Sequence, residues 1–203
     1  MRGNHNHGVR KIRKIAILLV FIILSCPLFA DGDFGSFGIT GGYSSVSEYG
    51  YIGFNGTYQL LASVTDDVSI GMGLHSDFAF GLGNRRSLPL LLGVMGGAGF
   101  EFRFGNELSL NLSIGPAVVC DVSDRNSSVG IGLGIDGAFS YFFGQEKCVG
   151  FSVGATAYPQ FLVIDDYGNK PFAISAMGYV ALTFRYPAPV TLLALPALTY
   201  LIY

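Results

Sequence analysis

The chain has 203 residues, of which half are hydrophobic and only 13 % are charged, and its formal net charge is −2. Soluble globular domains carry about 25 % charged residues, so this composition excludes an ordinary soluble protein. The 29 glycines, 17 phenylalanines and 11 tyrosines favour β-structure in a membrane, because aromatic residues are enriched in strands.

A secretory leader opens the chain. A basic segment precedes the unbroken apolar run 15–24, and a small residue, Ala30, stands before Asp31. This pattern predicts that residues 1–30 are a signal peptide, cleaved after Ala30. The apolar run is shorter than the ~20 residues of a spanning helix. Five of the 12 basic residues lie in the leader, so the remaining chain has seven basic and 14 acidic residues, which argues against nucleic-acid binding.

Alternation with a period of two runs through the rest of the chain and predicts eight strands. In chain order they cover 36–44, 51–64, 68–82, 90–104, 108–122, 129–143, 149–161 and 172–186. In the third of these, seven of the eight residues on one face are apolar, and the other face carries only Gly, Ala, Ser, His and Asp. Strands of a transmembrane barrel have this arrangement, with apolar side chains toward lipid and small or polar ones toward the lumen.

The connections between these strands alternate in length. They are longer after the first, third, fifth and seventh strands, and three or four residues long after the second, fourth and sixth. Bacterial outer-membrane barrels combine long external loops with short periplasmic turns. The sequence therefore predicts an all-β fold, an eight-stranded antiparallel up-and-down transmembrane β-barrel over residues 31–186. Pro116, which lacks a ladder donor, predicts a bulge or kink in the fifth strand.

Aromatic residues gather near both ends of the predicted strands and predict two girdles at the membrane interfaces. The last part of the final strand, residues 178–186, reads GYVALTFRY and ends on an aromatic residue. In this it resembles the terminal strand of the small eight-stranded outer-membrane barrels, the class that includes OmpW, OmpX and the OmpA membrane domain. The resemblance implies a place in a Gram-negative-type outer membrane, with outer-membrane lipid and the barrel assembly machinery as partners. Residues 187–203 form an apolar, proline-broken tail to which no role is assigned.

The inward faces carry few ionisable groups. A lumen polar network is predicted from His75, Asp77, Glu101, Arg103, Asp136 and Arg185, and further polar lining from Asn55, Gln59, Tyr158 and Gln160. Glu101, Arg103 and Arg185 fall toward the turn end of the lumen, and because buried charges need partners, they are expected to form an ion-pair cluster there. No nucleophile motif accompanies His75, and it is the one histidine outside the leader, so neither catalytic residues, a cofactor nor a metal site is predicted.

Two function classes stay open for such a barrel. The small-residue lumen favours a narrow pore or a conduit for small or apolar solutes, as OmpW-like barrels are thought to provide. The alternative is a structural or surface-interaction barrel that resembles OmpX and acts through its external loops. A lipid-modifying outer-membrane enzyme is a remote third reading, and conductance in planar bilayers separates the first two.

Overall fold

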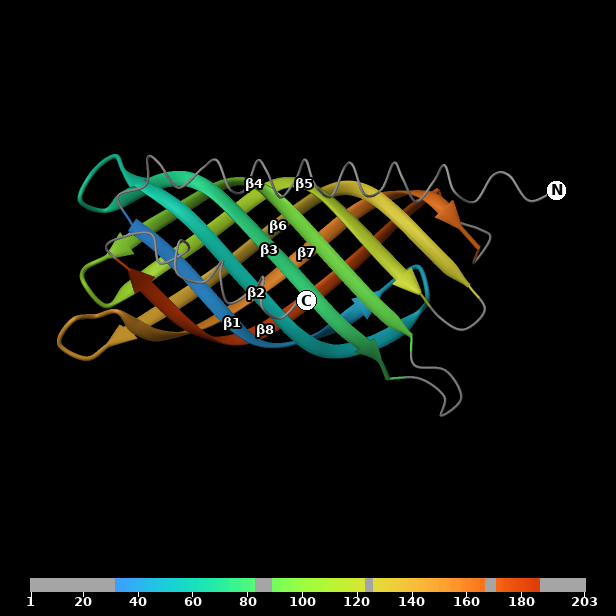
Figure 1. Cartoon of the computed structure of the whole chain (residues 1–203), viewed down its shortest axis with the longest axis horizontal. Coiled ribbons are helices and arrows are strands. Elements are labelled where there is room, and N and C mark those ends of the chain that lie inside the picture. The colour runs from blue at the N-terminus through green and yellow to red at the C-terminus, as the bar shows by residue number, and fades with distance from the viewer. Residues whose placement is uncertain (1–31, 83–88, 123–125, 167–170, 187–203) are drawn as a thin grey trace, which may run out of the picture.

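The computed structural model describes residues 32–82, 89–122, 126–166 and 171–186, which form one closed barrel of antiparallel strands (Figure 1). The strands are β1 Gly32–Ser44, β2 Tyr49–Ser63, β3 Val68–Gly81, β4 Leu90–Phe104, β5 Leu108–Val122, β6 Ser127–Phe143, β7 Val149–Asp165 and β8 Phe172–Tyr186. Each strand pairs with the next in sequence, and β8 closes on β1. The predicted fold class is confirmed. Within the described residues, no helix is long and apolar enough to cross a membrane.

The period of two in the sequence becomes two faces of the barrel wall. In β3, His75 and Asp77 are completely buried, whereas the outward Ile70 and Met72 are 42 % and 45 % exposed. The same alternation of buried and exposed side chains runs along the other strands. Because every strand has a neighbour on both sides, closure satisfies the backbone donors and acceptors without water, as hydrocarbon demands.

Two strands, β1 and β7, extend by four residues beyond the bounds that the alternation predicts. β1 begins at Gly32, and β7 continues to Asp165, where the sequence pattern indicates a loop from residue 164. Ile164 pairs with Val129, and Asp165 with Ser128. Main-chain pairing with β6 extends β7 beyond the point where apolar and polar side chains stop alternating. The hydrogen bonds of the ladder join backbone groups and do not depend on side-chain polarity.

The expected bulge at Pro116 is absent. The register of β5 with β4 is the same on either side of Pro116, where two pairs of the ladder are missing. Here the two backbones come so close that a Cβ on Gly97 would lie 2.2 Å from the Ile114 carbonyl oxygen. The lost proline N–H therefore interrupts the pairing locally without adding a residue. The one register shift among the described pairs lies between Val129 and Gly130.

The barrel has a turn end and a loop end. The connections after β2, β4 and β6, of four, three and five residues, gather at the left in Figure 1, and those after β1, β3, β5 and β7 lie at the other end. The latter have four, eight, four and six residues, so the predicted difference in length is wrong after β1 and β5, where β2 and β6 begin earlier than the alternation predicts. Outward aromatic residues mark both, with Phe104 and Phe151 near the turns and Phe54 and Phe161 near the loops. The signal peptide and the tail fall on residues 1–30 and 187–203, outside the described residues.

Candidate functional site in the barrel lumen

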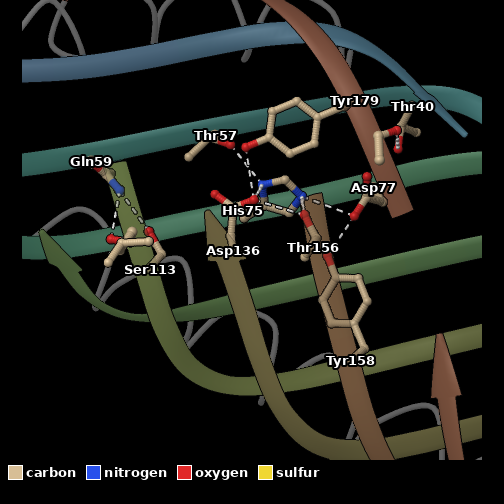
Figure 2. A network of polar contacts seen from close by, with 12 residues as sticks. Thr40, Thr57, Gln59, His75, Asp77, Ser113, Asp136, Thr156, Tyr158 and Tyr179 are labelled. Carbon is tan, nitrogen blue, oxygen red and sulfur yellow. Dashed lines mark hydrogen bonds and ion pairs between the residues drawn. The ribbon is translucent and has the colours of Figure 1, made fainter. Parts of the chain in front are cut away.

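The centre of the lumen holds a polar network around His75, which we call the central network (Figure 2). Its members are His75 and Asp77 from β3, Thr57 from β2, Asp136 from β6, Thr156 and Tyr158 from β7 and Tyr179 from β8. All seven are buried, and the most accessible of them, Thr57, is 5 % exposed. The strand parity explains this convergence, because each residue occupies an inward position on its strand.

Both ring nitrogens of His75 have oxygen partners. Nδ1 lies 2.7 Å from the Thr57 hydroxyl oxygen. Nε2 lies 3.0 Å from Asp77 Oδ2 and 3.0 Å from the Thr156 hydroxyl oxygen. A second carboxylate, Asp136, has its Oδ1 3.6 Å from Nδ1. The imidazole is thus held between two carboxylates from different strands, so that His75 ties β3 to β6 across the lumen.

Two tyrosines anchor the carboxylates of the central network. Tyr158 donates from its hydroxyl to Asp77 Oδ2 at 2.8 Å, and Tyr179 donates to Asp136 Oδ1 at 2.9 Å. Thr156 also donates to Asp136 Oδ1, at 2.9 Å. These hydrogen bonds compensate the burial of the carboxylates, because an isolated charge in an apolar interior is costly.

Some glycines of the inward faces are covered by large side chains from other strands. A Cβ on Gly93 would lie 2.9 Å from Cε2 of Tyr158, and a Cβ on Gly154 would lie 2.5 Å from Cζ of Tyr179. Toward the loop end, Tyr158 also packs in a buried apolar cluster with Leu91 and Met95. The small lining residues therefore do not leave open space at these positions, contrary to the expectation of a roomy lumen. The absence of side chains at Gly93 and Gly154 makes room for the rings of Tyr158 and Tyr179.

The other lining residues predicted from the sequence also point inward and are buried. Gln59 reaches across the lumen and donates from Nε2 to Ser113 Oγ on β5 at 2.8 Å. Gln160 donates from Nε2 to Ser175 Oγ at 3.2 Å. Asn55 makes no side-chain hydrogen bond that the described residues supply. Asn55 lies directly opposite Asp77 in the register of β2 and β3. The central network therefore borders an amide group that could still donate and accept hydrogen bonds.

The charged residues Glu101, Arg103 and Arg185 form a separate group near the turn end. Glu101 is 1 % exposed and accepts a hydrogen bond from Arg103 Nε at 2.9 Å and another from Arg185 Nη2. The Arg185 guanidinium also stacks on Phe142, with its carbon 3.9 Å from the ring centroid. Phe142 packs with Phe34 and Leu61 in a small apolar cluster. The six ionisable residues predicted for the lumen thus divide into two groups.

Sequence reasoning did not single out Thr57, Thr156 or Tyr179 for the central network. Each of them lies at an inward position, but the alternation does not say which inward residues meet. His75 contacts Thr57 from the neighbouring β2 and Thr156 from the distant β7. Within the described residues, no group of three or more His, Cys, Asp or Glu side chains is placed to hold a metal ion. The central network forms a hydrogen-bonded layer of side chains across the lumen. Together with its apolar neighbours Leu91 and Met95 we call this layer the septum.

Closed barrels with eight antiparallel strands and this inside-out polarity define a known fold, that of the small outer-membrane barrels. The structure is similar to Ail, the attachment invasion locus protein of Yersinia pestis, with 13 % identity and a TM-score of 0.51 over 78 % of this chain and 100 % of that one. It is also similar to Neisserial surface protein A, NspA, with 14 % identity and a TM-score of 0.51 over 76 % and 96 % of the two chains. No protein-family model and no curated protein sequence gives a significant match.

Proposed function

We propose that this protein is an outer-membrane barrel that is closed to solutes and acts through its two ends. Residues 1–30 serve as the export signal in this proposal, and residues 32–186 span the membrane. The outward faces support the membrane assignment, because large apolar residues such as Phe37 and Ile39 are more than 60 % exposed there. In water such a surface would be a severe liability, whereas in lipid it is the required one.

The observation that carries the closed state is the central network together with its apolar neighbours. Side chains from five strands meet at His75, and Tyr158, Leu91 and Met95 continue the filling toward the loops. An eight-stranded barrel is only wide enough for its interior side chains to fill. The filled lumen supports a structural or surface-interaction barrel over a pore. It gives no support to an enzyme, because His75 is completely buried.

Planar-bilayer recording tests this proposal. The wild-type protein is expected to give no stable conductance steps after insertion. A double variant, Leu91→Gly with Tyr158→Gly, removes two large side chains from the septum and should conduct, which shows that insertion and detection work. Stable conductance of the wild-type protein at the level of this variant would overturn the closed-barrel proposal and restore the pore.

A further inference from the structure

A cavity of about 690 Å³ opens at the turn end of the barrel. Its inner wall includes Phe34, Leu61 and Arg185, and its mouth is formed by the turns after β2, β4 and β6. Pockets for small ligands in proteins have volumes of about 300–1,000 Å³ and combine apolar walls with a few placed polar groups. We propose that this cavity binds the end of a short cationic peptide, with its carboxylate toward the interior and an ammonium group at the mouth.

The inner end of the cavity offers guanidinium donors. Arg103 and Arg185 both line it, and together they face the single carboxylate of Glu101. Two guanidinium groups carry ten N–H donors, and within the described part of the chain Glu101 and the Ser69 hydroxyl take three of them. The Nε atom of Arg185 is buried and has no hydrogen-bond partner among the described residues. Paired arginines with unused donors suit a carboxylate, which binds guanidinium in a bidentate manner.

The mouth of the cavity has the opposite charge. Asp66, Asp67 and Glu146 line it and are exposed. The one lysine at the mouth, Lys147, is held by Glu107, whose carboxylate oxygen lies 2.6 Å from Nζ. An ammonium group at the mouth would therefore meet carboxylates that no described basic side chain contacts at ion-pair distance.

The whole lining has an excess of acidic groups. Besides the residues already named it includes Asp33, which accepts a hydrogen bond from the Tyr58 hydroxyl at 2.7 Å. Five acidic residues thus face three basic ones along the cavity, so a ligand with more ammonium than carboxylate groups balances it best. The cavity opens between the turns and not through the lipid-facing wall, which favours a water-soluble peptide over the headgroup of a lipid in the bilayer.

Binding is tested on the full barrel in detergent with lysylalanine as the probe. Cys148 lines the cavity and serves as a reporter, because a bound ligand should slow its reaction with a maleimide. Cys120→Ser removes the other thiol outside the leader. Lysylalanine is expected to protect Cys148, and titration calorimetry should give the same affinity. Lysylalanine amide, which lacks the carboxylate, should bind about tenfold more weakly, since a hydrogen-bonded charge is lost.

Substitutions distinguish the two ends of the cavity. Asp66→Asn with Asp67→Asn should weaken lysylalanine about fivefold, and Arg103→Gln about tenfold or more. Glu48→Gln, at the loop end, makes the same charge change as either aspartate substitution and should have no effect. Circular dichroism establishes that each variant is folded, and the amide comparison needs no variant at all.

Equal affinity for lysylalanine and its amide, or no protection of Cys148, would overturn the proposal. Tighter binding of glycerophosphoethanolamine than of the peptide would assign the cavity to a lipid headgroup instead, and would also overturn it. The peptide proposal rests on the proposed function in one respect, namely that the lumen is closed behind the cavity and so gives the cavity an inner end. Conductance of the wild-type protein would contradict the closed barrel and leave the binding result untouched.

Discussion

Gly93 offers a direct test of the septum. A methyl group at this position would lie 2.9 Å from Cε2 and 3.0 Å from Cζ of Tyr158, which is fully buried and bonded to Asp77. Gly93→Ala should therefore displace the ring. Overpacking of a filled interior costs about 1–3 kcal/mol. Loss of a hydrogen bond to a charged group costs about 1.5–3 kcal/mol. The ring can shift partway, so the overpacking cost and the hydrogen-bond cost need not both be paid in full. We therefore expect a loss of about 2–4 kcal/mol in the free energy of unfolding.

The matched control for this substitution is Gly96→Ala on the same strand. Gly96 lies on the outward face, and its nearest neighbour to an added methyl group is a Leu74 methyl carbon at an ordinary 3.7 Å. The assay is urea unfolding in lipid vesicles, followed by far-ultraviolet circular dichroism and by gel mobility of unheated samples. Tyr158→Phe alone should cost about 1.5–3 kcal/mol.

The double variant of Gly93→Ala and Tyr158→Phe decides whether the mechanism is right. If the methyl group acts by pulling the Tyr158 hydroxyl from Asp77, the double variant loses that hydrogen bond only once, and its cost falls below the sum of the single variants. Equal stability of Gly93→Ala and Gly96→Ala would refute the packing of Tyr158 on Gly93. Strictly additive costs in the double variant would refute the loss of the Tyr158 hydrogen bond.

Three further outcomes are expected. A cysteine placed at Asn106, in a short turn, should escape an impermeant maleimide on intact cells and react after the envelope is opened; labelling on intact cells would reverse the orientation. Cys120 and Cys148, which are free and lie toward opposite ends of the barrel, should stay unpaired under non-reducing mass spectrometry, and an intramolecular bridge would contradict the strand order. Lys147 lowers the pKa of Glu107 by hydrogen bonding and charge, so this ion pair is present at neutral pH and is lost as the pH falls through the lowered value. Lys147→Met should raise the Glu107 pKa in an NMR titration, and an unchanged value would argue against the pair.

Much of the fold was readable because strand parity is a local property. A period of two assigns each residue to the inside or the outside of the wall, and closure follows from the even number of strands. Six strand boundaries at the short turns were found to the residue or nearly so, since glycine, asparagine and acidic residues mark those turns.

The filling of the lumen was less accessible from the sequence. Parity places Gly93 and Tyr158 on the inside, but it does not say that a ring from β7 covers a glycine of β4. That contact depends on strand tilt and on the stagger between strands, which only the closed barrel fixes. Counting small residues therefore suggests space where cross-lumen packing has removed it. The separate cluster of Glu101, Arg103 and Arg185, by contrast, was predicted, because the positions of these residues along their strands place them near the turns.

The closure of β8 on β1 has a consequence for the order of folding. Thr40 donates from its hydroxyl to the Gly178 carbonyl oxygen across 138 residues of sequence, whereas the other strand pairs are hairpins. Each doubling of loop length adds about 0.6 kcal/mol of closure entropy, so this seam costs about 2 kcal/mol more to form than a pairing some 15 residues apart. Hairpins form in microseconds, and distant strand pairing is slow. The seam should therefore form last, and until it does the chain is a curved sheet with two unpaired edges, able to zip onto a second chain as readily as onto itself.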